Sequence, residues 1–286
     1  MARIGYLLDQ RHPCSFFQDY KPRNMQKMSK GFRTYLITGG LVLLAFVHSA
    51  CTSGGGQTET TDQEIPSDFV DLFDGVSLSG WRGDTTLWRV EDKAIVGEIQ
   101  PGDELERNSF IIWEDGQPTD FELIAEYRMS GQGNSGFNYR SEELPDLPFA
   151  LRGYQADIDA ANTYTGQNYE ERGRAILAFP GERVRLPPVD GAISDYAIGN
   201  IWTAREKVDS LGNRDSLKLN IKPDDWNELR IVADGNRLQH YINGVLMSDV
   251  TDDDEKNRKL EGLIGFQVHV GPPMKIAFRN IRLRNL

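Results

Sequence analysis

Residues 266–270, FQVHV, place an amide and an imidazole close together near the end of the chain. Successive side chains of a strand point to opposite faces, so Gln267 and His269 share one face and apolar residues occupy the other. An imidazole titrates near neutral pH, which makes His269 a candidate general base or metal ligand. The alternative is a half-exposed histidine beside the glycine–proline turn that follows. A polar face on an otherwise apolar strand indicates contact with water or with a ligand.

Two further strand-like stretches carry polar residues on one face. In residues 153–159, Gln155 and Asp157 share a face, and in residues 134–140 Arg140 shares one with an asparagine. If these strands are neighbours in one sheet, their amide, carboxylate and guanidinium groups form a groove that suits the hydroxyls of a sugar. The alternative is a face that is only solvated, as one side of an antiparallel sheet often is.

Other candidates also have a structural and a functional interpretation. His240 lies among apolar residues of an alternating stretch, which fits either a core histidine or a site residue. Glu171 belongs to the charged run EER. Such runs are commonly solvated, but this one could also close the groove, with Glu171 meeting Arg172 or a cation. The acidic residues 252–255 lack the spacing of an EF-hand, and we expect them in an exposed loop.

The charge balance and the missing motifs exclude several classes of protein. Residues 51–286 carry 25 Lys and Arg against 41 Asp and Glu, a net charge of −16. This balance argues against binding nucleic acid or an anionic lipid surface. The sequence also lacks a phosphate-binding loop, a dinucleotide fingerprint, HExxH and GxSxG. A protein that acts on or binds a neutral substrate is the class that remains.

The first fifty residues have the pattern of an export signal. An uncharged apolar run at residues 34–47 follows a basic stretch and precedes Ser-Ala-Cys51. Cys51 indicates a bacterial lipoprotein, in which this cysteine becomes the lipidated N-terminus. His48 departs from that pattern, because an aliphatic residue is expected three positions before the cysteine. A simple secreted protein and a retained membrane anchor are the alternatives.

The N-terminal region divides into three expected segments. Nothing before Met25 resembles a targeting signal, so we expect residues 1–24 to be an untranslated or non-native leader. Residues 25–50 form the lipoprotein signal peptide, and residues 51–66, rich in Gly, Thr and Gln, form a flexible tether. The expected location is the bacterial cell envelope, lipid-anchored and either periplasmic or surface-exposed. The lipid anchor is then the only membrane contact.

Residues 67–286 predict one all-β domain. Short alternating stretches recur along this region, separated by turn signals such as Asp-Gly and Asn-Gly, and no segment has a long helical period. Residues 237–250, with Asn243-Gly244 at their centre, predict a hairpin. We therefore expect a jelly-roll β-sandwich of two antiparallel sheets. Residues 177–216 lack a clear period and are expected to form a long loop or insertion over one rim.

Five motifs in order resemble one known family. They are DLFDGVSLSGW, DFELIAEYRMSGQGNSGFNYR, GYQADID with TGQNYEERGR, DDWNELRIVADGNRLQHYINGV and GLIGFQVHVGPPMKIAFRNIRL. Together they resemble the 3-keto-disaccharide hydrolase family, long known only as a domain of unknown function. The resemblance covers residues 69–286. It implies a concanavalin-like β-sandwich, commonly on lipoproteins, and an activity on glycosides already oxidised to a ketone at sugar carbon 3.

The resemblance also implies which positions form the site. A ketone at C3 acidifies the proton on C2, so a modest base can remove it, expel the C1 substituent and leave a product that water hydrates. The polar positions carried over from the family pattern are Asn134, Arg140, Gln155, Asp157, Glu171, His240, Gln267 and His269.

His269, Arg140, Asp157 and His240 are the expected catalytic residues, and Asn134, Gln155, Glu171 and Gln267 are expected to bind the substrate. His269 is expected as the base or as a metal-ligating partner, and Arg140 as the electrostatic stabiliser of the enolate. Asp157 and Gln155 are expected to orient the substrate, or Asp157 to hold a divalent cation with His269. A non-catalytic carbohydrate-binding lipoprotein that uses the same groove is the alternative function, and a purely structural surface protein is a third.

Overall fold

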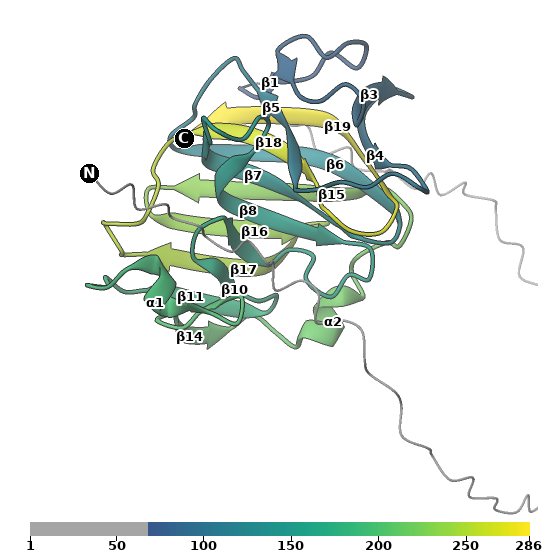
Figure 1. Cartoon of the computed structure of the whole chain (residues 1–286). Helices are drawn as coiled ribbons and strands as arrows, with labels where there is room; N and C mark the ends of the chain where they lie inside the picture. Colours follow the sequence, from purple (N-terminus) through teal and green to yellow (C-terminus); the bar gives the residue numbers. More distant parts are fainter. Residues whose placement is uncertain (1–67) are drawn as a thin grey trace, which may run out of the picture. The chain divides into compact units, whose positions relative to one another are not determined.

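The computed structural model describes residues 68–286, and two β-sheets packed face to face account for most of them (Figure 1). Sheet A has the spatial order β14 (Glu206–Ser210), β11 (Glu182–Leu186), β17 (Val245–Asp252), β16 (Arg237–Ile242), β15 (Asn227–Asp234), β6 (Phe121–Gly131), β19 (Met274–Asn285), β4 (Ala94–Ile99) and β3 (Trp88–Glu91), with β1 (Val70–Asp71) paired to β19.

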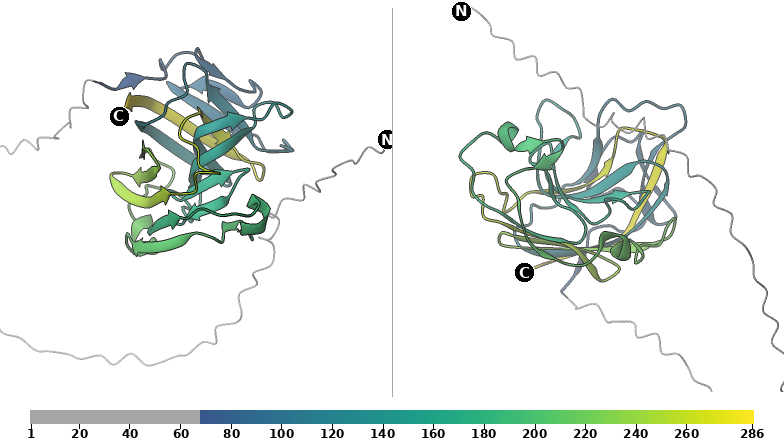
Figure 2. Two further views of the ribbon diagram at one scale, coloured as in Figure 1. Left: turned by 90° about the vertical axis from the view of Figure 1, so that its left-hand side faces the viewer. Right: turned by 90° about the horizontal axis from the view of Figure 1, so that it is seen from below.

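Sheet B forms the second layer, and Figure 2 shows the two layers from two further directions. Its order is β12 (Ala197–Ile198), β13 (Ile201–Trp202), β10 (Ala175–Ala178), β9 (Asn168–Glu171), β8 (Leu151–Asp159), β7 (Asn134–Glu143), β18 (Leu263–Val268), β5 (Ser109–Trp113) and β2 (Trp81–Arg82). Two short helices, α1 (Ile193–Tyr196) and α2 (Arg214–Lys218), lie in the connections.

The predicted all-β sandwich is confirmed, with one correction to its strand directions. Most neighbouring strands are antiparallel, as expected, but β10 pairs with β13 in parallel and β11 pairs with β17 in parallel. Both sheets are therefore mixed. The hairpin of β16 and β17 is confirmed. Asn243 and Gly244 at its turn have φ of 49° and 77°, the left-handed pair that a type I′ turn needs.

The core between the sheets explains why polar residues gather on one face of sheet B. The ring of Phe266 in β18 stacks on that of Phe278 in β19, with centroids 3.9 Å apart, and Phe137 of β7 meets Phe266 edge-on. Burial of each such ring contributes roughly 2–3 kcal/mol. Because successive side chains in a strand point to opposite faces, the sequence neighbours of these core-facing residues in sheet B point away from sheet A. The opposite face of sheet B therefore receives Gln155, Asp157 and their neighbours.

Residues 177–216, expected as a loop or insertion, instead extend both sheets. The segment supplies β11 and β14 to sheet A and β12 and β13 to sheet B. The five residues of β14 are all exposed, so no apolar alternation marks that strand in the sequence. Strands of two to five residues at a sheet edge carry too few side chains to produce a readable period.

The acidic run at 252–255, expected in an exposed loop, is partly buried. Asp252 and Asp254 are 1% and 0% exposed. The guanidinium of Arg174, itself fully buried, lies 2.5 Å from Asp252 Oδ2, and the hydroxyl of Tyr154 donates to the same oxygen at 2.6 Å. A buried carboxylate is tolerated only with such partners, and sequence spacing gave no sign that Arg174 would supply them.

No helix within residues 68–286 is long and apolar enough to cross a membrane. The expected leader, signal peptide, tether and lipidation site at Cys51 lie outside the described residues and stay predictions.

Candidate functional site

Six polar side chains meet on the face of sheet B that points away from sheet A, and we call them the polar cluster. Strands β8 and β18 supply Gln155, Asp157 and Gln267, strand β9 supplies Glu171, and loops supply two more. The cluster consists of Asn108, Gln155, Asp157, Gln167, Glu171 and Gln267. Five of the six are no more than 6% exposed, and Asn108 is half-buried. Charged and amide groups at this depth are stable only when they satisfy one another or bind a ligand.

Gly136 allows the cluster to form across strand β7. Its register neighbours are Asp157 on β8 and Gln267 on β18. The Gln155 side chain lies over Gly136, so that Gln267 Nε2 donates to Gln155 Oε1 at 3.2 Å. A Cβ at position 136 would lie 2.4 Å from Cδ of Gln155, so the Gln155 side chain could not keep its present position. The absence of a side chain at Gly136 therefore joins β8 to β18.

Asp157 is the titratable centre of the polar cluster. Gln155 Nε2 donates to its Oδ1 at 2.6 Å, and Gln167 Nε2 donates to its Oδ2. Burial raises the pKa of Asp157 to about 7, and the nearby carboxylates of Glu171 and Asp159 add to that rise, while the two amide donors oppose it. Near neutral pH this carboxyl group can therefore both accept and return a proton.

Glu171 lies at the other side of the cluster and is held in place from three directions. Asn108 Nδ2 donates to its Oε1 at 3.1 Å, and Gln267 Nε2 lies 3.4 Å from its Oε2. Arg172 Nε is 3.7 Å from Oε1. Glu171 therefore connects the carboxyl-bearing strands to a guanidinium at the β9–β10 turn.

Several buried polar atoms in and beside the cluster have no hydrogen-bond partner within residues 68–286. They are Oε1 of Gln167 and Gln267, both amide atoms of Asn138, Oδ1 of Asn134 and Nε of Arg172. Leaving one such atom unpaired costs roughly 1–3 kcal/mol, so a native protein places water or a ligand against it. Acceptors and donors concentrated on one face indicate a ligand with several hydroxyl or carbonyl groups.

Arg140 lies outside the polar cluster, which corrects the expectation that it shares the groove. A bulge in β7 and a left-handed backbone, with φ of 45°, turn its side chain toward the loops at one end of the sheet. Its guanidinium donates to the carbonyls of Thr119 and Gly235 at 2.7–2.9 Å and to Asp120 Oδ1 at 2.9 Å. Burial lowers the pKa of Arg140.

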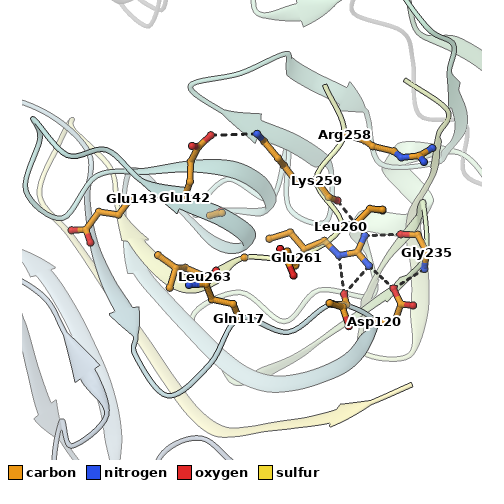
Figure 3. Close-up of a pocket in the computed structure, with 14 residues that line it drawn as sticks. Gln117, Asp120, Glu142, Glu143, Gly235, Arg258, Lys259, Leu260, Glu261 and Leu263 are labelled. Atoms are coloured by element: carbon orange, nitrogen blue, oxygen red, sulfur yellow. Dashed lines mark hydrogen bonds and ion pairs between the residues drawn. The ribbon is translucent and has the colours of Figure 1, made fainter. Parts of the chain in front are cut away.

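Figure 3 shows a pocket at this end of the sheet, and Arg140 is one of the residues that line it. The pocket has a volume of about 790 Å³, and both carboxylates and cations line it, among them Glu142, Glu261, Arg258 and Lys259. All the strong donors of Arg140 point at loop carbonyls or at Asp120, so its role in this structure is to hold three loops together.

His240 lies between the two sheets, which corrects the expectation that it lines the groove. It is fully buried, with Tyr139 Oη 2.8 Å from Nε2 and the Gln167 carbonyl 3.1 Å from Nδ1. Burial lowers its pKa to about 4, so the ring is neutral at pH 7. His240 fixes the backbone of Gln167, whose side chain donates to Asp157. Its contribution to the cluster is therefore positional.

His269 follows β18, two residues beyond Gln267, and is half-buried. Its Nδ1 lies 2.6 Å from the carbonyl of Val270, whose amide donates to Oδ1 of Asn108 at 3.0 Å. The segment with His269 is thus tied to the cluster through Asn108, and its role as base stays a prediction. Within residues 68–286 no group of three or more His, Cys, Asp and Glu is arranged to hold a metal ion, so the suggested cation site of His269 and Asp157 gains no support.

Asn134 begins β7 beside the cluster, with its Oδ1 buried, and Asn108 and Gln167 are cluster members that single-strand alternation missed. Both missed residues lie in loops, where no periodicity marks the inward side. The only sequence signal for Gln167 is its place in TGQNYEERGR, next to the predicted Glu171.

The fold and the polar cluster indicate the class of protein. It is a β-sandwich with amides and carboxylates gathered on one sheet face, and such a set of groups suits a carbohydrate. The sequence pattern of the 3-keto-alpha-glucoside-1,2-lyase-like domain matches residues 68–284. The chain belongs to this family, in agreement with the resemblance read from its motifs. Among curated proteins, none matches the sequence.

Three solved structures similar to this chain have low sequence identity. A protein from Parabacteroides distasonis ATCC 8503 with a provisional assignment as a glycosyl hydrolase shares 17% identity, covers 76% of this chain and 99% of its own, and has a TM-score of 0.48. A carbohydrate binding module from Bacillus subtilis shares 17% identity, covers 72% of this chain and 96% of its own, and has a TM-score of 0.45. A Bacillus subtilis protein of unknown function with a galectin-like fold shares 13% identity, covers 73% of this chain and 90% of its own, and has a TM-score of 0.43.

Proposed function

We propose that this chain is a glycoside-cleaving enzyme that acts on 3-keto-glycosides by base-assisted elimination, followed by hydration to give net hydrolysis. The observation that carries the proposal is Asp157, a buried carboxyl group with a pKa of about 7, held by Gln155 and Gln167 on the sheet face where unpartnered polar atoms gather. A base for this chemistry needs a pKa close to the working pH.

The proposed reaction begins with transfer of the C2 proton to the Asp157 carboxylate. The C2–H electron pair moves toward C3, and the negative charge develops on the ketone oxygen. The carbonyl then reforms while a C1–C2 double bond forms and the C1–O bond breaks. The leaving group departs with the bonding electrons and takes up the proton that Asp157 has accepted. Water adds across the C1–C2 double bond to complete net hydrolysis.

Gln155, Gln167 and Gln267 have a shared role in this proposal. The amides of Gln155 and Gln167 hold Asp157 at a fixed orientation, and Gln267 in turn holds Gln155. The Oε1 atoms of Gln167 and Gln267, which have no partner within residues 68–286, accept hydrogen bonds from sugar hydroxyls. A carboxylate that is already oriented loses little entropy when the substrate arrives. His269 remains the second candidate for the base, since the same segment is tied to the cluster through Asn108.

A non-catalytic carbohydrate-binding protein is the alternative function, and the dense set of amides favours it as well. Such a protein needs acceptors and donors for hydroxyls but no group that titrates near neutrality. The two functions differ in the effect of replacing Asp157. Loss of the titrating oxygen should abolish catalysis while leaving sugar binding within a few-fold of the wild-type affinity.

The test is release of a chromogenic phenol from 3-keto-glucosides of both anomeric configurations, by the wild type and three variants. We expect Asp157→Asn to lower kcat by at least about 10²-fold, because proton transfer by a positioned group contributes that much. Glu126→Gln, a carboxylate on sheet A paired with Arg279, is the control and should retain full activity. Unimpaired Asp157→Asn together with inactive His269→Ala would transfer the role of base to His269. A wild type that releases nothing but binds the sugar would establish the alternative function.

We also propose that the chain is exported and lipid-anchored through Cys51. The pattern that supports this is the basic stretch, apolar run and small residues before Cys51. Metabolic labelling with a radioactive fatty acid in a bacterial host should label the wild type and leave Cys51→Ser unlabelled. A labelled Cys51→Ser would contradict the assignment.

A further inference from the structure

The proposed elimination needs a positive or hydrogen-bonding group at the ketone oxygen, where negative charge develops. Arg140, the cation expected in this role, donates its hydrogen bonds to Thr119, Gly235 and Asp120 in the loops at one end of sheet B. The cluster itself therefore needs another electrophile, and within residues 68–286 a guanidinium lies close to one of the cluster carboxylates, Glu171.

Arg172 is that guanidinium. It occupies the turn between β9 and β10, directly after Glu171, and its Nε lies 3.7 Å from Glu171 Oε1. Its side chain is 16% exposed, so part of it reaches solvent. The Nε–H is buried and has no hydrogen-bond partner within residues 68–286. A buried, unpaired donor on a charged group is costly, and an incoming oxygen would satisfy it.

The backbone at this turn gives an independent reason to single out Arg172. Its φ is 54°, in the left-handed region that glycine adopts without strain and that costs a residue with a long side chain roughly 1–2 kcal/mol. Strain of this kind is retained where the surrounding structure holds the residue for a purpose. The strained conformation directs the guanidinium toward Glu171 and the polar cluster.

We propose that Arg172 is the electrophilic catalyst of the reaction and that its guanidinium binds the C3 oxygen of a 3-keto sugar. This inference rests on the proposed function. When Asp157 takes the C2 proton, the electron pair of the broken C2–H bond forms the C2–C3 double bond, and the carbonyl π electrons move to the C3 oxygen. Arg172 stabilises that enolate through charge-assisted hydrogen bonds. When the C1–O bond breaks, the carbonyl reforms and the guanidinium keeps its protons throughout.

The first test separates enolate formation from bond cleavage. A 3-keto-1,5-anhydroglucitol carries no aglycone at C1, so the enzyme has no glycosidic bond to cleave and can still exchange the C2 proton for deuterium in D₂O. We expect the wild type to catalyse this exchange and Arg172→Gly to lose about 10²–10³-fold in rate. Glycine suits the left-handed backbone, so Arg172→Gly should fold with an unchanged or slightly higher melting temperature.

The second test asks whether the lost group can be replaced from solution. Added guanidinium or methylguanidinium ion at millimolar concentration should restore part of the exchange rate of Arg172→Gly and leave the wild type unaffected. Arg172→Lys should retain more activity than Arg172→Gly, because a point charge remains. Lys93→Gly is the matched control, a basic residue with φ of 60° in the β3–β4 turn of sheet A, and it should exchange at the wild-type rate.

The outcomes distinguish this inference from the proposed function. Exchange by the wild type and an equally active Arg172→Gly would overturn the role of Arg172 and leave the proposed function standing. Loss of exchange without rescue, accompanied by a lowered melting temperature, would make Arg172 a structural residue and would also overturn the role. A wild type that neither exchanges nor cleaves any 3-keto sugar would overturn both.

Discussion

Gln267 on β18 donates a hydrogen bond to Gln155 on β8, although strand β7 lies between them. The contact exists because Gly136 leaves the middle strand without a side chain at that point. Through it, the strand that carries Asp157 and the strand that precedes His269 act as one unit. The position of the titrating carboxyl group therefore depends on a residue with no functional group of its own.

Gly136→Ala should test this dependence directly. The new Cβ would lie 2.4 Å from Gln155 Cδ, so either the strand shifts or the glutamine leaves its partners. We expect a loss of roughly 1–3 kcal/mol in the free energy of unfolding and a lower kcat on a 3-keto-glycoside. Urea denaturation measures the first and chromogenic release the second. Combining it with Gln155→Ala should recover part of the lost stability, since the two groups compete for one space, and strict additivity would refute the steric explanation.

Asp157→Asn should make the protein more stable at alkaline pH while removing activity. In the folded state the pKa is raised from 3.8 to about 7, so between these values the unfolded chain releases the proton first. The contribution of Asp157 to the stability of the wild type therefore falls as pH rises from about 4 to 7, by up to roughly 4 kcal/mol. The amide cannot ionise and avoids that loss. The free energy of unfolding, measured at pH 4.5 and at pH 8, should be higher for the variant than for the wild type only at pH 8. An equal difference between the two proteins at both pH values would contradict the assignment.

The pH dependence of His240 runs in the opposite direction. Its pKa falls from 6.5 to about 4 on folding, so as pH drops from 6.5 to 4 the unfolded chain takes up the proton first and stability is lost, by up to roughly 3 kcal/mol. Between pH 4 and 6.5 the contribution of His240 to the free energy of unfolding rises with pH, while that of Asp157 falls. The two contributions should nearly cancel in the wild type. In His240→Gln the free energy of unfolding should fall as pH rises, because only the contribution of Asp157 remains. In Asp157→Asn it should rise with pH, because only that of His240 remains. Two variants with the same slope would show that one assignment is wrong.

The sequence predicted the parts of the fold and site that depend on alternation. Gln155, Asp157 and Gln267 were placed on a shared face because each follows an apolar residue in a strand long enough to show its period. The same reasoning failed for Arg140, because the bulge in β7 lies at this position, between Tyr139 and Glu142, and interrupts the alternation there.

His240 and Gln167 show a second limit of alternation. The pattern that put His240 among apolar residues was correct, but only the pairing of sheets reveals that its partner is a loop carbonyl. Gln167 approaches Asp157 from a loop, where no period exists. Arg172 was visible as part of a charged run, yet its left-handed backbone and its unpaired Nε are properties of the folded turn.

Arg140 should prove important for stability and unimportant for chemistry. Its buried guanidinium joins Thr119, Gly235 and Asp120, and Arg140→Gln would remove these hydrogen bonds between loops, at a cost of roughly 1–3 kcal/mol. Because none of these groups belongs to the polar cluster, kcat per folded molecule should stay within about twofold of the wild type at a temperature well below melting. Thermal unfolding and active-site titration, measured on the same preparation, separate the two effects. A large fall in kcat with unchanged stability would instead place Arg140 at the reacting sugar, and the loop-end pocket would then replace the polar cluster as the site of catalysis.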